Sequence, residues 1–136
     1  FNSKKYYKLK YSHTYIYMSE SVDKFKKNPL ASRINEINRI KIAHPDRCAI
    51  FIGKLNSDTL LPDITKHKYL VPYDFTMAQF MYTIRRYIKV SAETAIFLFI
   101  NNMVTTNHSS IGKLYEEYKS EDGFLYITYA GENTFG

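Results

Sequence analysis

The sequence contains no tryptophan and a single cysteine, Cys48, among its 136 residues. One thiol cannot close an internal disulfide or supply the paired cysteines of a structural zinc site. This composition is typical of proteins from a reducing compartment, so we expect an intracellular protein. The 13 tyrosines take the place of tryptophan and favour rings that are partly buried with a hydrated hydroxyl.

Long apolar segments are also missing. No run approaches the roughly 20 apolar residues that a membrane-spanning helix needs. Residues 1–18 alternate lysine and tyrosine where a signal peptide would have a continuous apolar centre. We therefore expect any membrane attachment to be added chemically or made at the protein surface.

Convergent catalytic groups are not evident. His13, His44, His67 and His108 lie far apart, and no HExxH, P-loop or GxSxG pattern occurs. Cys48 lies in an apolar stretch that predicts a strand, which favours a packed and unreactive thiol. We predict that the chain is not an enzyme and uses no cofactor or metal.

Length and charge divide the chain. Its 136 residues suit one domain with its own core. Residues 1–27 carry seven lysines against two acidic residues, which gives +5 of the net charge of +6. This basic end could meet anionic lipid, an acidic protein or nucleic acid, or remain a solvated tail. We divide the chain into an N-terminal extension (1–21), a domain (22–131) and a flexible tail (132–136).

Helix signals come first along the chain. Asn28 and Pro29 predict a helix start, with the asparagine as the cap and the proline at the first helical position. The helix should end before Pro45. Its apolar face would be formed by Leu30, Ile34, Ile37 and Ile40.

The remaining elements predict an α+β fold. Thr76 and Gln79 have the spacing of a capping box, ahead of a helix that extends to Ile88. The strands alternate with helices in the order of a β-grasp domain, so the first and last strands should pair at the centre of the sheet. We therefore expect a four-stranded mixed sheet, with two additional N-terminal helices. The expected strands are 48–52, 67–72, 95–100 and 124–129, and the expected helices are 22–26, 29–44, 76–88 and 110–119.

The C-terminal segment ends in Phe135 and Gly136. It has no apolar periodicity, and it can be read as a frayed end or a cloning boundary. Its functional interpretation is a carboxylate threaded through a narrow enzyme channel, for which a residue without a Cβ atom is suited.

Several motifs occur in order from about Val22 to Gly136, and together they resemble the autophagy-related ubiquitin-like modifiers of the GABARAP type. That family has a β-grasp domain preceded by two helices. The motifs are Lys41–Arg47, Lys66–Pro72, Thr76–Arg86, Ile96–Asn102, Leu114–Glu117, Glu121–Tyr126 and Phe135–Gly136.

The resemblance implies a mechanism. A cysteine protease would expose Gly136, an activating and a conjugating enzyme would carry it as an adenylate and a thioester, and an amide bond would join it to phosphatidylethanolamine. The protein would be cytoplasmic, and would lie on autophagosomal membranes when lipidated. There it would recruit cargo receptors and adaptors, and no nucleic acid is expected as a partner.

The resemblance also implies a groove for aromatic-x-x-aliphatic peptides, which would add as a strand beside Lys68, Tyr69 and Leu70. The aromatic pocket would use Glu36, Ile40, Phe51, Lys68, Leu70 and Phe124. The aliphatic pocket would use Tyr69, Val71, Pro72, Phe75, Phe80 and Ile84. Acidic residues that flank the peptide would be attracted by Arg47, Lys66 and Lys68.

Three positions depart from the family pattern and predict a shifted ligand preference. Ala49 stands where many members have proline, Thr83 replaces an apolar residue, and Tyr87 replaces a basic one. The segment Tyr15–Met18 has an aromatic-x-x-aliphatic pattern, from which we hypothesise that the extension docks as an added strand. Two other functions stay open: an interaction domain that is never conjugated, and a basic module that binds single-stranded nucleic acid.

Overall fold

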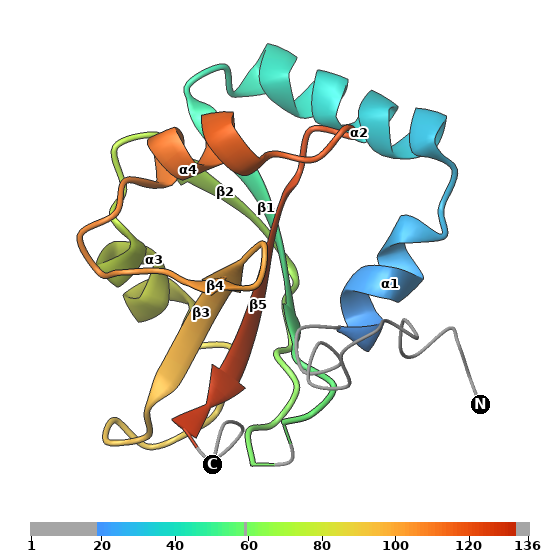
Figure 1. The fold of residues 1–136 in the computed structure, drawn as a ribbon. Helices are drawn as coiled ribbons and strands as arrows, with labels where there is room; N and C mark the ends of the chain where they lie inside the picture. The colour runs from blue at the N-terminus through green and yellow to red at the C-terminus, as the bar shows by residue number, and fades with distance from the viewer. Residues whose placement is uncertain (1–18, 59, 133–136) are drawn as a thin grey trace.

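The structure is a computed structural model that describes residues 19–58 and 60–132. Expectations for the extension up to residue 18, including the docking of Tyr15–Met18, and for Gly136 lie outside the described residues. Figure 1 shows helices packed against a twisted sheet. The elements are α1 (Glu20–Lys26), α2 (Leu30–Ala43), β1 (Arg47–Lys54), β2 (Lys68–Pro72), α3 (Met77–Ile84), β3 (Ile96–Ile100), β4 (Met103–Val104), α4 (Ile111–Tyr118) and β5 (Leu125–Gly131).

The sheet has the strand order β2-β1-β5-β3-β4. Its central pair, β1 and β5, is parallel, with Ile50 opposite Leu125, whereas β2 pairs antiparallel with β1. This central pairing confirms the arrangement predicted from the order of elements. The fold class, an α+β β-grasp domain with two extra N-terminal helices, is confirmed as well.

One strand, β4, was not expected. It pairs with β3 through a tight turn in which Asn101 and Asn102 have φ angles of 49° and 66°. Two consecutive residues in the left-handed region are what a two-residue hairpin of type I′ requires, and asparagine tolerates that region well. The asparagine pair therefore turns the chain back onto β3 where we had expected only the end of a strand.

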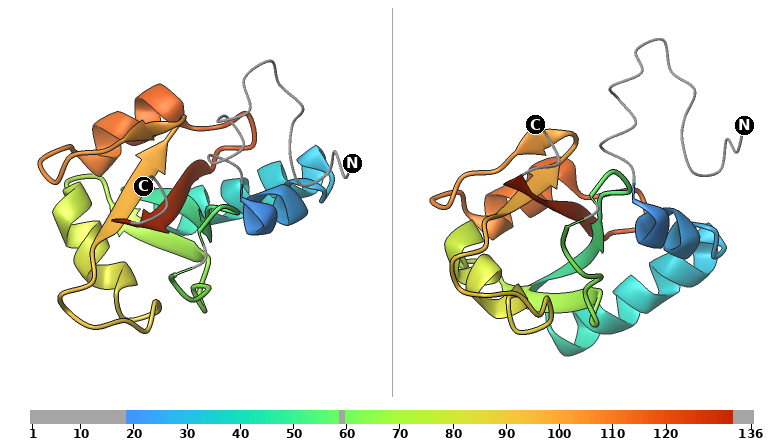
Figure 2. Two further views of the ribbon diagram at one scale, coloured as in Figure 1. Left: turned by 60° about the horizontal axis from the view of Figure 1, so that its bottom comes forward. Right: turned by 90° about the horizontal axis from the view of Figure 1, so that it is seen from below.

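The helices cover both faces of the sheet (Figure 2). The larger core lies on the face of α3 and α4, where Phe80, Ile84 and Tyr115 pack on Ile127 of β5 and are at most 1% exposed. A smaller core lies on the face of α1 and α2, centred on Phe51.

Two helix ends differ from prediction. Asn28 does not cap α2: the N-cap is Pro29, with no side-chain capping bond. The Asn28 carbonyl instead accepts a hydrogen bond from Nε of Arg33 at 3.0 Å. Helix α3 keeps the predicted capping box but ends at Ile84. After Ile84 the Tyr87 amide donates to the Ile84 carbonyl at 2.8 Å, a bond between residues three positions apart that forms a tighter turn than an α-helix. Ile88, which was expected to lie at the end of the helix, is still fully buried.

Candidate functional site

Strand β2 lies at one edge of the sheet, and no strand among the described residues pairs with its outer side. The Ile52 amide donates to the His67 carbonyl, and the Tyr73 amide donates to the Asp46 carbonyl. Backbone groups alternate between partners in an antiparallel pair. The amides and carbonyls of Lys68 and Leu70 therefore point outward, where an added strand could bond to them.

The side chains of β2 alternate as well. Tyr69 and Val71 are buried in the larger core beneath α3, whereas Lys68 is exposed and Leu70 is half-buried. Leu70 packs with the smaller core, on the face of α1 and α2. The edge thus has apolar side chains on both faces of the sheet, as strand addition with two anchors needs.

A cavity of about 340 Å³ opens beside this edge, and we call it the α2–β2 cavity. Its lining comes from α2, from β1 and β2 with the loop before β2, and from Phe124, the residue before β5. The structure brings together five of the six residues expected for the aromatic pocket. The cavity is lined by Glu36, Ile40, Ala49, Lys66, Lys68, Tyr69, Leu70 and Phe124.

Phe51, the sixth residue of that set, does not line the cavity. Its ring is stacked between Phe25 of α1, at 4.5 Å between centroids, and His67, at 5.4 Å. The packing of α1 on β1 therefore covers Phe51, and Ala49, which pairs with Leu70, takes its place in the cavity wall. Ala49 could have been found from the two-residue period of strands, because it shares a face with Phe51.

Two lysines line the cavity and Arg47 lies farther along the β2 edge, and each of the three has a partner in the structure. Lys68 forms an ion pair with Glu36 at 2.9 Å, and its ammonium lies 4.7 Å from the centre of the Phe25 ring. Arg47 donates from Nη1 to the outward carbonyl of Leu70 at 3.3 Å. Lys66 lies over the ring of Tyr69. An acidic ligand would meet positive charge along the whole edge.

The residues expected for the aliphatic pocket lie together between β2 and α3, but mostly below the surface. Tyr69 and Val71 are 5% and 3% exposed, and Phe80 and Ile84 are fully buried. Pro72 and Phe75 are half-buried. The Tyr69 ring contacts Phe80 edge to face, with 5.6 Å between centroids. The four buried side chains are therefore core residues in the structure, whereas Pro72 and Phe75 remain partly exposed.

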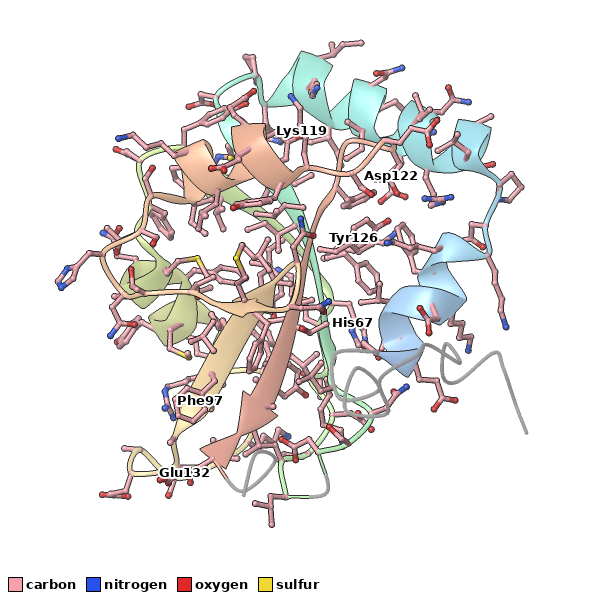
Figure 3. All side chains as sticks on the ribbon, in the orientation of Figure 1. His67, Phe97, Lys119, Asp122, Tyr126 and Glu132 are labelled. Atoms are coloured by element: carbon pink, nitrogen blue, oxygen red, sulfur yellow. The ribbon has the colours of Figure 1, made fainter. Side chains whose placement is uncertain are left out.

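A buried carboxylate holds the α2 side of the cavity in place. Asp122 is 2% exposed and accepts from Nη1 of Arg33 on α2 at 2.5 Å, from the Tyr126 hydroxyl, and from the Phe124 amide at 2.9 Å. Burial and the bond to Asp122 both raise the pKa of Tyr126, which keeps it a donor. Figure 3 shows Asp122 and Tyr126 between α2 and the sheet. Sequence reasoning missed this cluster.

A second buried carboxylate holds the end of β5. Asp58 is 3% exposed; its Oδ1 accepts the amides of Leu60 and Leu61 at 2.7 and 2.9 Å, and its Oδ2 accepts the Gly131 amide at 2.5 Å. Glu132, labelled in Figure 3, follows at once and lies at the opposite end of the sheet from α2. The last segment therefore leaves from a fixed point remote from the α2–β2 cavity.

Groups that could carry catalysis are packed or separate in the described part of the chain. Cys48 is fully buried, and burial raises the pKa of its thiol to about 12. Nδ1 of His67 lies 2.8 Å from the Ile52 carbonyl. Residues 19–58 and 60–132 contain no cluster of three or more His, Cys, Asp or Glu side chains that could hold a metal ion. None of the helices they form is long and apolar enough to cross a membrane.

Comparisons with known proteins agree with this geometry. A sequence model described as "Autophagy protein Atg8 ubiquitin like" matches residues 32–136. Autophagy-related protein 8a of Arabidopsis thaliana is 49% identical over 109 residues, which cover 80% of this chain and 88% of the relative. Autophagy-related protein 8 of Dictyostelium discoideum is 50% identical over 118 residues, with coverages of 85% and 95%. The crystal structure of Trypanosoma brucei ATG8 superposes with a TM-score of 0.77 at 35% identity and covers 83% of this chain and 97% of that chain. The chain therefore belongs to the Atg8 family of autophagy-related ubiquitin-like proteins.

Proposed function

We propose that this chain is a ubiquitin-like modifier joined through Gly136 to phosphatidylethanolamine, and that it recruits proteins through aromatic-x-x-aliphatic peptides bound at the β2 edge. The observation that carries the peptide part is the open edge of β2 beside the α2–β2 cavity. Family membership supports the conjugation part. In this role the chain is a substrate and carrier in a reaction and not the catalyst.

The peptide would be recognised through two kinds of contact. Its backbone bonds to the outward amides and carbonyls of Lys68 and Leu70, and its aromatic side chain enters the α2–β2 cavity. Arg47, Lys66 and Lys68 attract acidic residues that flank the motif, an effect that weakens with salt. An aromatic anchor that contributes about 1.5 to 3 kcal/mol, with an aliphatic anchor that contributes no more than this, gives micromolar affinity more readily than picomolar affinity.

Conjugation would use the segment after Glu132. Gly136 stands four residues beyond Glu132. Four extended residues reach about 14 Å, enough to enter an enzyme channel while the Asp58 contacts hold Gly131. The proposed partners are an activating enzyme, a conjugating enzyme and a cysteine protease for processing and release. Buried acyl chains contribute about 0.8 kcal/mol per methylene, so the two chains of the lipid give a lasting anchor. The lipidated protein would reside on autophagosomal membranes and the free protein in the cytoplasm.

Reconstitution tests the conjugation. The chain is incubated with its activating and conjugating enzymes, ATP and liposomes that contain phosphatidylethanolamine, and a gel shift reports the lipidated product. Gly136→Ala should largely abolish the product with an unchanged circular dichroism spectrum. Gly131→Ala is no suitable control, because an added Cβ would lie 3.3 Å from Leu61; Asn133→Ala is used instead. Equal lipidation of Gly136→Ala and the unaltered chain would refute the role of Gly136.

A further inference from the structure

Three consecutive residues after α3, Arg85, Arg86 and Tyr87, point in different directions. The guanidinium of Arg85 donates to the Thr94 carbonyl at 2.7 Å, and the guanidinium of Arg86 lies 5.7 Å from the centre of the Tyr82 ring. The Tyr87 ring instead contacts Tyr69 of β2, at 5.8 Å between centroids and an interplanar angle of 66°. Tyr87 is thus the residue of this run that faces the β2 edge.

Lys66 completes a small cluster around this contact, which we call the Tyr87 cluster (Lys66, Tyr69 and Tyr87). The Lys66 ammonium lies 5.0 Å from the centre of the Tyr69 ring and 5.4 Å from that of Tyr87, within the range of cation–π attraction. The Thr65 amide also donates to the Tyr87 carbonyl at 3.1 Å. The ring and the loop before β2 are therefore held together, and Tyr69 keeps only 5% of its surface exposed.

The closed cluster carries an internal cost. The hydroxyl oxygen of Tyr69 is buried and has no hydrogen-bond partner in the structure. Burying a hydroxyl without a partner is unfavourable, because its bonds to water are lost without replacement. A movement of Tyr87 that let water reach this hydroxyl would recover part of the cost of opening.

We propose that Tyr87 sets the specificity of peptide binding at the β2 edge. Its ring lies against Tyr69 and closes the aliphatic pocket, here called the aliphatic subsite, so an aliphatic anchor must displace the Tyr87 ring to enter. This inference rests on the proposed peptide-binding function. The aromatic anchor meets an open cavity of about 340 Å³, whereas the aliphatic anchor spends part of its binding free energy on opening. The groove therefore takes peptides with an acidic flank and an aromatic anchor, and discriminates weakly at the second anchor.

Isothermal titration calorimetry with two peptides tests the proposal. Both carry the same acidic flank and tryptophan anchor, and they differ only in leucine or alanine three positions later. The affinity ratio of the two peptides should stay within about threefold for the unaltered chain and rise to about tenfold or more for Tyr87→Ala, because leucine then enters an open subsite. Tyr87→Phe keeps the ring over Tyr69 and should match the unaltered chain. Equal ratios in all three proteins would overturn the inference.

A second measurement uses the unaltered protein and does not depend on the folding of a variant. The ring resonances of Tyr87 should shift when the leucine peptide binds and stay in place with the alanine peptide. If the Tyr87 resonances did not shift at saturation with the leucine peptide, the proposal that Tyr87 closes the aliphatic subsite would be overturned. The variant Leu70→Glu distinguishes a failure of peptide binding at the β2 edge from a failure of the role proposed for Tyr87. If Leu70→Glu abolishes binding while Tyr87→Ala leaves the leucine-to-alanine affinity ratio unchanged, peptide binding at the β2 edge is supported and closure by Tyr87 is refuted. If the unaltered chain binds neither peptide, both proposals are refuted.

Discussion

Replacing Asp122 by alanine removes the acceptor of three donors at once. Its side chain is fully buried, and the Arg33 side chain is only 14% exposed, so the guanidinium would lose its counter-ion in a poorly hydrated place. Breaking a buried ion pair by removing one partner costs about 3 to 5 kcal/mol. The Tyr126 hydroxyl and the Phe124 amide lose their acceptor in the same step. We therefore expect Asp122→Ala to lower the free energy of unfolding by about 3 to 5 kcal/mol.

Urea denaturation followed by circular dichroism measures this change. The matched control is Glu116→Ala, which removes the acidic partner of Lys119 and the acceptor of a 3.3 Å hydrogen bond from the Tyr73 hydroxyl. The side chains of Lys119 and Glu116 are 36% and 59% exposed. Such a surface pair is worth about 0.2 to 1 kcal/mol. A double variant, Arg33→Met with Asp122→Leu, should recover part of the loss, because no buried charge is left without a counter-ion, although the Tyr126 hydroxyl and the Phe124 amide still lack their acceptor. A loss below about 1 kcal/mol for Asp122→Ala, equal to the control, would refute the reasoning.

Three further predictions concern the β2 edge, the buried cysteine and the end of β5. Tyr69→Ala combined with Leu70→Ala should weaken binding of an aromatic-x-x-aliphatic peptide by at least about 2 kcal/mol in calorimetry; because Tyr69 is a core residue, Leu70→Ala alone should be measured too, and affinity within twofold of the unaltered chain for both would count against the site. Cys48, whose thiol pKa is raised to about 12, should resist iodoacetamide at pH 8 until the protein is unfolded; rapid labelling of the folded chain by mass spectrometry would contradict its burial. Asp58→Ala leaves the Gly131 amide without its acceptor and should cost about 1 to 3 kcal/mol in urea denaturation, whereas an unchanged midpoint would show that the contact does not stabilise β5.

Local signals explain what could be predicted from the sequence. The capping box of Thr76 and Gln79 involves residues three positions apart, and it is present as expected. The central pairing of β1 with β5 followed from the order of elements and the handedness of their connections. The asparagine pair at 101–102 also carried a readable signal, because consecutive asparagines favour the left-handed turn that creates β4.

Contacts between distant segments explain the rest. The ion pair of Arg33 and Asp122 joins residues 89 positions apart, and no local pattern indicates it. Phe51 is covered because α1 packs on β1 and brings Phe25 onto its ring. The sequence showed tyrosine at position 87 where the family pattern has a basic residue, and this departure predicted a shifted ligand preference. Its contact with Tyr69 required the distance between α3 and β2, which the sequence does not give.

The strand order also has a mechanical consequence. A partner held along β2 and a membrane that holds the C-terminal end would pull on the domain in opposite directions. The tension would pass from β2 to β1 and then to β5, since these strands are neighbours in that order. Because β1 and β5 are parallel and paired from Ile50 opposite Leu125 to Lys54 opposite Tyr129, this load shears their hydrogen bonds together and does not open them one by one. With the lipid attachment and peptide binding proposed above, the domain would act as a tether that keeps its shape under load.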